Sequence, residues 1–137
     1  MEFLWTYLLP FLAILTALVF VHELGHYSVA RWAGVRVEVF SIGFGPELFG
    51  WTAASGARWK FSAIPLGGYV KMFGDSDPAS AGQADDSGWT DDQRKVAFHN
   101  QSLRDRALII AAGPAANFAF AIVLLAGLFM TAGQPQA

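Results

Sequence analysis

Two histidines and a glutamate lie close together in the segment His22-Glu23-Leu24-Gly25-His26. Residues four apart on an α-helix point the same way, about 40° apart around the axis, so both imidazoles can bind one metal ion. Glu23 stands beside them and can accept a proton from a water on that metal. The pattern predicts a hydrolase of the metalloprotease type, with His22 and His26 as metal ligands, Glu23 as the catalytic base and Zn²⁺ as the cofactor.

The position of this motif is as informative as its residues. It directly follows the apolar, uncharged run from Phe3 to Val21, where a membrane span would be ending. In a soluble helix the same five residues can occur by chance, with the histidines on a polar surface. Ionisable side chains are costly in hydrocarbon, however, so three of them at the end of a span indicate a functional site.

Hydrophobic residues make up 54% of the chain and are concentrated in two blocks, Phe3 to Val21 and Ala107 to Ala132. Each block can cross a hydrocarbon core of about 30 Å. Neither has the polar face expected of a buried helix in a soluble protein, and the first lacks the basic segment that opens a signal peptide. We therefore expect a multi-pass α-helical membrane protein, with two transmembrane helices and a membrane-associated β-hairpin or small sheet between them.

The charged residues predict the orientation of the chain in the membrane. All nine Lys and Arg residues lie from Arg31 to Arg106, between the two apolar blocks. The positive-inside bias then puts this segment in the cytoplasm and both termini outside. The net charge of −2, without a basic stripe, argues against a nucleic-acid partner. With no cysteine, the chain has no disulfide and no thiolate metal site.

The segment after the metal motif has the alternating pattern of strands. Val35 to Phe40 is the first expected strand, Trp59 to Ile64 the second and Tyr69 to Met72 the third. Ser41 to Pro46 is rich in turn residues and is expected to be a loop, and Pro65 to Gly68 a bend. Aromatic side chains are too dense here for a small sheet to bury alone, which predicts contact with lipid or with the spans.

A change of composition at Gly74 marks another region. Gly74 to Asp92 contains six aspartates among small residues, which predicts a solvated loop; their spacing lacks the glycine and glutamate of an EF-hand calcium site. Gln93 to Arg106 is expected to be an amphipathic helix or turn at the membrane interface. The chain thus divides into a first transmembrane helix with the zinc motif (1–33), a membrane-associated β region (34–73), a cytoplasmic acidic loop with interfacial helix (74–106) and a second transmembrane helix (107–132).

Four segments in this order resemble the bacterial site-2 protease family, in particular the regulator-of-sigma-E protease group of intramembrane zinc metalloproteases. They are His22–His26, Gly43-Phe44-Gly45-Pro46, Ile64–Met72 and Ala112-Gly113-Pro114-Ala115-Ala116-Asn117-Phe118. The resemblance implies a protease of the bacterial inner membrane that hydrolyses membrane-embedded, single-span substrates such as anti-sigma factors.

One departure from the family pattern concerns the metal. The family's third zinc ligand is an aspartate in a Leu-Asp-Gly motif on a later span, and no such motif occurs here. We expect that ligand beyond residue 137. The PDZ domain that usually follows the second span in this family is not part of this sequence. His99 is the one further histidine, and we expect it to be a solvent-exposed residue. The alternative function is a catalytically inactive homologue that binds or regulates substrates, although such a protein would not need Glu23.

A helical substrate must be unwound before it is cut, because its backbone groups are already paired. An exposed strand edge can pair with the freed groups, so the β region is the expected substrate site. Alternatively, its glycines and aromatics only shape a turn at the membrane surface. Asn117, in the second span, is a secondary candidate, with a helix-to-helix hydrogen bond beside Gly113-Pro114 as the alternative. The candidate substrate-contact residues are Gly43, Phe44, Gly45, Pro46, Gly67, Gly68 and Tyr69.

Overall fold

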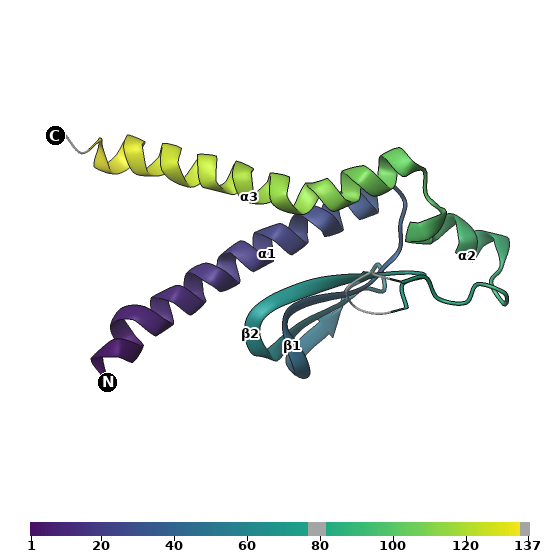
Figure 1. The fold of residues 1–137 in the computed structure, drawn as a ribbon, viewed down its shortest axis with the longest axis horizontal. Helices are drawn as coiled ribbons and strands as arrows, with labels where there is room; N and C mark the ends of the chain where they lie inside the picture. Colours follow the sequence, from purple (N-terminus) through teal and green to yellow (C-terminus); the bar gives the residue numbers. More distant parts are fainter. Residues whose placement is uncertain (77–81, 135–137) are drawn as a thin grey trace.

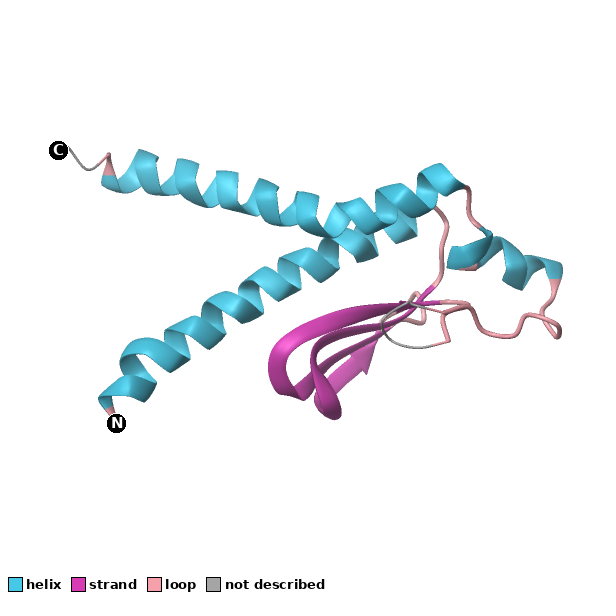
Figure 2. Ribbon diagram, in the orientation of Figure 1, coloured by secondary structure: helices cyan, strands magenta, loops and turns pink. Residues whose placement is uncertain are grey.

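The computed structural model describes residues 1–76 and 82–134. Asp77, one of the six aspartates of the expected acidic loop, lies outside the described residues. Two long helices and a curved hairpin dominate the fold (Figures 1 and 2). In chain order the elements are a π-helical turn η1 (Leu4–Leu8), α1 (Leu9–Trp32), β1 (Val37–Thr52), β2 (Arg58–Met72), α2 (Asp91–Val96), the 3-10 turn η2 (Phe98–Asn100) and α3 (Leu103–Ala132).

Two helices are long and apolar enough to cross a membrane. The first, Leu4–Trp32, has 29 residues and the second, Leu103–Ala132, has 30, each with a mean hydropathy of 2.2. None of the most apolar stretch of the first helix is buried within the protein, and only 11% of that of the second. A core helix of a soluble protein would be mostly buried, so both helices have the surface of membrane spans. The expectation of two helices long and apolar enough to span a membrane is confirmed.

The two long helices pack closely where they cross, then diverge towards the chain termini (Figure 1). Gly25 makes this approach possible: a Cβ atom placed there would overlap the carbonyl oxygen of Ala112 and lie 2.7 Å from Cβ of Ala116. α3 contains Pro114 and bends near this crossing. A proline inside a helix removes one backbone hydrogen bond, which accounts for the bend. The close contact brings the middle of α3 against the metal motif.

The sheet consists of two long antiparallel strands, not the three short strands expected from the sequence. β1 and β2 each fold back on themselves, so Val39–Ile42 pairs with Arg58–Phe61 and also with Gly68–Lys71. Phe49–Thr52 pairs with the other side of Arg58–Phe61. The segment Gly68–Lys71 therefore lies at one edge of a curled sheet, next to α1.

The expected loop and bend are parts of these strands. Ser41 to Pro46 lies within β1, and Pro65 to Gly68 lies within β2. Gly43 and Gly45 have φ angles of 89° and 81°, a backbone conformation that favours glycine. They turn β1 sharply without ending its pairing. The sequence signals for a turn are real, but the turns occur inside strands.

Aromatic packing attaches the hairpin to α1. Phe40 of β1 is buried and stacks on Trp59 of β2, with ring centroids 4.2 Å apart. Tyr27 of α1 meets both rings edge-on, at 5.7 Å from Phe40 and 5.1 Å from Trp59. Because Tyr27 directly follows His26, this cluster holds the hairpin beside the metal motif. The outer end of the hairpin is different: Leu48, Phe49 and other large apolar side chains there are exposed.

The expected interfacial helix from Gln93 to Arg106 is instead two short pieces, α2 and η2, and the start of α3. α2 begins with a capping box: the Gln93 amide N–H donates to Thr90 Oγ1 at 3.2 Å, and the Thr90 N–H donates to Gln93 Oε1 at 2.8 Å. Ser102 caps α3 by accepting from the Asp105 N–H at 3.1 Å. The second cap starts a new helix, which is why a single amphipathic one does not form.

The acidic region is also less uniformly solvated than its composition predicts. Asp75 is buried, and its Oδ2 accepts a hydrogen bond from the Met72 N–H at 2.8 Å. Its Oδ1 lies 3.2 Å from Nε2 of His99. The contact between Phe73 and Trp89, with ring centroids 4.8 Å apart, further fixes this part of the chain to the end of β2. His99 is thus engaged by a carboxylate, not solvent-exposed as expected.

Candidate metal and catalytic site

His22 and His26 lie on the face of α1 that meets α3. Their Nε2 atoms are 3.0 Å apart, and their rings meet at 79°. Two Zn–N bonds of about 2.05 Å at a tetrahedral angle would place the nitrogens about 3.3 Å apart. Little movement is therefore needed for both nitrogens to bind one zinc ion, and the pair fits this metal.

The backbone of α3 orients His26. Its Nδ1 is 2.7 Å from the carbonyl oxygen of Ile109, which can only accept a hydrogen bond. The ring therefore carries its proton on Nδ1 when neutral, and Nε2 keeps a free electron pair for a metal. Histidine ligands are commonly held this way, by a carbonyl or carboxylate on the other ring nitrogen. This contact could not be predicted from the sequence, because every residue has a backbone carbonyl.

Gly113 gives the two imidazoles their space. A Cβ atom there would overlap the ring of His26 and lie 2.8 Å from Nε2 of His22. From the sequence, the Gly113-Pro114 pair predicts a kink in the helix and does not predict that Gly113 contacts the histidines. Asn117, one turn further on, has its Nδ2 3.3 Å from Nδ1 of His22. The hydrogen bond between helices considered for Asn117 is present, and its partner is a candidate metal ligand.

Glu23 is buried on the side of α1 that faces the hairpin. A Cβ atom on Gly68 would come within 3.4 Å of Cγ of Glu23 and 2.8 Å of Cγ1 of Val19. The absence of a side chain at Gly68 thus lets the edge segment of β2 lie directly against α1. The candidate catalytic base and the candidate substrate edge are neighbours.

A cleft of about 310 Å³ opens at this place between α1, α3 and the hairpin. Of the seven candidate substrate-contact residues, Phe44, Gly67 and Gly68 line it. Gly43 does not line it and is buried against the Ser62 and Ile64 carbonyls. Gly45, Pro46 and Tyr69 are not among its lining residues. The full lining is Leu15, Leu18, Val19, His22, Glu23, Phe44, Gly67, Gly68 and Asn117.

A third metal ligand is not found in the part of the chain that the structure describes. No group of three or more His, Cys, Asp or Glu side chains that could hold a metal occurs within residues 1–76 and 82–134. His99 faces Asp75. The expectation of a third ligand beyond residue 137 stays a prediction.

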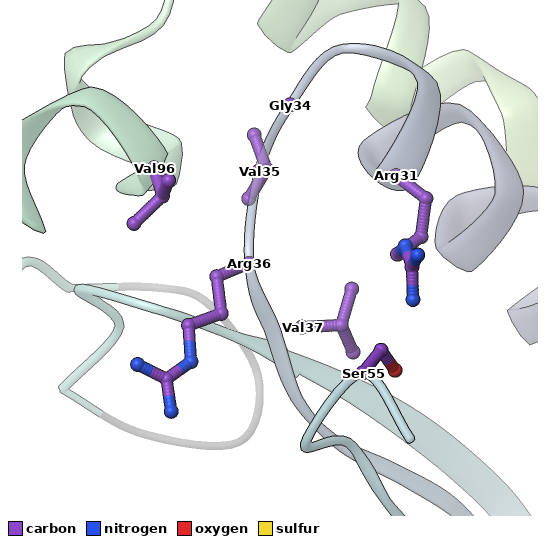
Figure 3. Close-up of a pocket in the computed structure, with 7 residues that line it drawn as sticks. All are labelled: Arg31, Gly34, Val35, Arg36, Val37, Ser55 and Val96. Atoms are coloured by element: carbon purple, nitrogen blue, oxygen red, sulfur yellow. The ribbon is translucent and has the colours of Figure 1, made fainter. Parts of the chain in front are cut away.

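A second pocket, of about 370 Å³, lies at the C-terminal end of α1 (Figure 3). Arg31 and Arg36 line it together with Gly34, Val35, Val37, Ser55 and Val96. The two guanidinium groups lie on opposite sides of the Val35–Val37 segment in this view and do not converge on one point. None of the candidate catalytic or metal-binding residues reaches this pocket, so the cleft at His22 is the candidate functional site.

The fold and site together define a protein with a paired-histidine metal motif on an apolar helix, beside a curled hairpin. Residues 10–136 match Peptidase family M50, and the chain belongs to this family. The expected resemblance to the site-2 protease family is confirmed.

Relatives from several bacteria support this assignment. A protein of Agrobacterium fabrum named a zinc metalloprotease is 53% identical over 135 residues, covering 96% of this chain and 35% of the relative. One of Rhizobium meliloti with the same description is 53% identical over 142 residues, covering 96% and 36%. The metalloprotease MmpA of Caulobacter vibrioides is 41% identical over 138 residues, covering 94% and 35%. The chain spans about a third of the length of these relatives.

Proposed function

We propose that this chain carries the zinc-binding and catalytic half-site of an intramembrane metalloprotease, which hydrolyses peptide bonds of membrane-embedded substrates. The observation that carries this proposal is the cleft that joins His22, Glu23 and the edge of β2. The family and the names of the relatives support zinc as the metal and proteolysis as the reaction. Single-span proteins such as anti-sigma factors are the substrate class that we propose.

Each residue of the site has a separate task in this proposal. His22 and His26 hold the metal, which when bound acts as a Lewis acid and makes a water more acidic. Glu23 accepts the proton of the attacking water and passes it to the departing amine. Glu23 is buried on the face of α1 that meets β2, where it lines the cleft.

The hairpin supplies what a helical substrate needs. The carbonyl and amide groups of an unwound segment require new partners in a medium without water. The edge segment Gly68–Lys71, next to Glu23, can pair with such a segment as an added strand. Leu48 and Phe49 at the outer end of the hairpin are apolar and exposed, so this end can insert into lipid beside the spans. The substrate would thus be held extended across the cleft.

The test separates metal binding from chemistry in the full-length protein. Glu23→Gln keeps both imidazoles, so zinc content should stay at the wild-type level while turnover falls by roughly 10²-fold or more. His22→Ala should lose zinc and turnover together. Zinc content by atomic absorption and cleavage of a single-span reporter protein are the two measurements.

Glu2→Gln is the matched control. Glu2 is exposed near the amino terminus and does not line the cleft. This variant should retain zinc and turnover. Normal cleavage by Glu23→Gln would contradict the assigned role of Glu23, and absence of cleavage by the wild-type protein would favour an inactive homologue.

A further inference from the structure

A continuous chain of hydrogen bonds runs through the two histidines. His26 donates from Nδ1 to the Ile109 carbonyl, so its Nε2 can only accept. His22 Nε2, 3.0 Å away, must then be the donor to it. Nδ1 of His22 is left as an acceptor, and Nδ2 of Asn117 donates to it at 3.3 Å. The order of donors in this arrangement is Asn117, His22, His26, Ile109.

This arrangement cannot persist when both histidines bind a metal. His26 is ready, because its Nε2 already carries the free electron pair. His22 carries its proton on Nε2, the nitrogen that faces the candidate metal position. Binding therefore requires the neutral His22 ring to move its proton to Nδ1, and Nδ1–H then needs an acceptor where an N–H group of Asn117 now lies.

The other end of the Asn117 side chain can supply that acceptor. Oδ1 of Asn117 is buried and has no hydrogen-bond partner among the described residues. A carboxamide that rotates by about 180° exchanges its oxygen and nitrogen without moving the rest of the side chain. After rotation, Oδ1 accepts from Nδ1–H of His22, and the Nε2 electron pair is free.

We propose that Asn117 is a positioning residue whose carboxamide reverses when metal binds, so that it selects the metal-binding tautomer of His22. Asparagine is suited to this task because one side chain offers both a donor and an acceptor. Its place on α3 is also favourable: Ile109, Gly113 and Asn117 are spaced by four residues and face His22 and His26, which are spaced likewise. The proposal rests on the proposed metal-binding function.

Two variants of Asn117 and one control variant show whether the side chain acts as an acceptor, as a donor or only by its volume. Asn117→Asp keeps an acceptor and loses the donor. Asn117→Leu keeps the volume and loses both. Phe118→Leu, at an exposed neighbour on the same helix, is the control.

The measurement is the tautomer of His22, read by ¹⁵N NMR of full-length protein labelled at histidine and assigned by single-histidine replacements. Metal-free wild type should show His22 protonated at Nε2, and zinc-loaded wild type at Nδ1. Metal-free Asn117→Asp should already carry a proton at Nδ1 of His22, whether or not Nε2 is protonated as well, because a carboxylate can only accept from that nitrogen. His26, held by the Ile109 carbonyl, should show Nδ1–H throughout and so report that the helix contact is intact.

Zinc affinity, measured by competition with a chromophoric chelator, is the second readout. Asn117→Leu should bind zinc about 10- to 100-fold more weakly, the usual effect of losing a partner of a metal-bound histidine. Asn117→Asp and Phe118→Leu should stay near the wild-type value. If Asn117→Leu disturbs His26 as well, the Asp variant decides. A proton on Nδ1 of His22 in that variant supports the proposal, and an unprotonated Nδ1 overturns it.

An unchanged His22 tautomer on zinc loading, or wild-type zinc affinity in Asn117→Leu, would also overturn it. These outcomes are distinct from failure of the proposed function. A protein that binds zinc and switches tautomer but cleaves nothing would count against proteolysis alone, and one that binds no zinc would count against both.

Discussion

At the level of single residues, the site depends on two glycines as much as on the histidines and the glutamate. Gly113 and Gly68 have no reactive group, yet a Cβ atom on Gly113 would overlap an imidazole and one on Gly68 would press on Val19 and approach Glu23. The histidines can lie against α3 only because Gly113 has no side chain. Glu23 can lie against β2 only because Gly68 has none. The function of each glycine is steric.

Gly113→Ala tests this point. Alanine is a better helix former than glycine by about 1 kcal/mol, so the helix itself should not weaken. The added methyl group would displace the imidazoles, and zinc affinity should fall by about 10-fold or more. Gly127→Ala is the matched control on the same helix, because nothing lies within 4 Å of a Cβ atom there. Equal zinc affinity in both variants, measured by chelator competition, would show that the histidines tolerate a Cβ at Gly113.

The sequence could predict part of this site and not the rest. His22, Glu23 and His26 are recognisable because their spacing matches a helical turn and their types match a zinc hydrolase. The Ile109 carbonyl is not recognisable, since every residue has one and only the crossing of the helices selects it. Asn117 is an intermediate case. A polar residue in an apolar span predicts a hydrogen bond, but its partner depends on how the two helices cross.

At the scale of elements, the crossing of α1 and α3 is the contact on which the site depends. Small residues on both helices, Gly25 with Ala112 and Ala116, bring the backbones together, a type of contact that is common between membrane helices. This contact determines where along α1 the residues Gly113 and Asn117 of α3 meet the histidines. A change at the crossing should therefore affect the metal site without touching a ligand.

Gly25→Ala should separate the helices, because its Cβ would overlap the backbone of α3. Overpacking of this kind costs about 1–3 kcal/mol, which should lower the thermal unfolding temperature of the detergent-solubilised protein. Zinc affinity should fall as well, although the ligands are unchanged. If Gly25→Ala had the unfolding temperature and the zinc affinity of the wild-type protein, the two helices would be packed less closely at the crossing than the structure indicates.

The hairpin shows why strands were predicted less well than helices. The apolar runs that form α1 and α3 are long and continuous, so their lengths alone indicated helices. In the β region, Gly43, Gly45 and Pro65 are ordinary signals for the end of a strand. Here the glycines bend β1 without ending it, because their positive φ angles let the backbone turn while it remains paired. The continuation of pairing through a turn depends on the partner strand, which a local pattern does not specify.

At the scale of the whole molecule, the distribution of charge predicts the orientation in the membrane. The nine basic residues lie between the two apolar blocks, Phe3 to Val21 and Ala107 to Ala132, which would place the loop before α2 in the cytoplasm. Gly88 is exposed in this loop, and nothing lies within 4 Å of a Cβ atom there. It is therefore a good position for a single cysteine in an otherwise cysteine-free chain.

Gly88→Cys should react with a membrane-impermeant thiol reagent only after the cytoplasmic side is made accessible. Intact cells should give no labelling, and inverted membrane vesicles should give full labelling. Labelling in intact cells would reverse the predicted orientation. A cysteine at Glu2, near the amino terminus, should show the opposite pattern and serves as the control.

We have proposed that the cleft beside His22 and Glu23 is where peptide bonds are cut within the membrane. A direct test reconstitutes the full-length protein in lipid vesicles with a single-span reporter and determines the cleavage site by mass spectrometry of the products. We expect a cut inside the apolar span, which is lost when zinc is chelated and restored when zinc is returned. A cut confined to the parts of the reporter outside the membrane, or cleavage that survives removal of zinc, would contradict it.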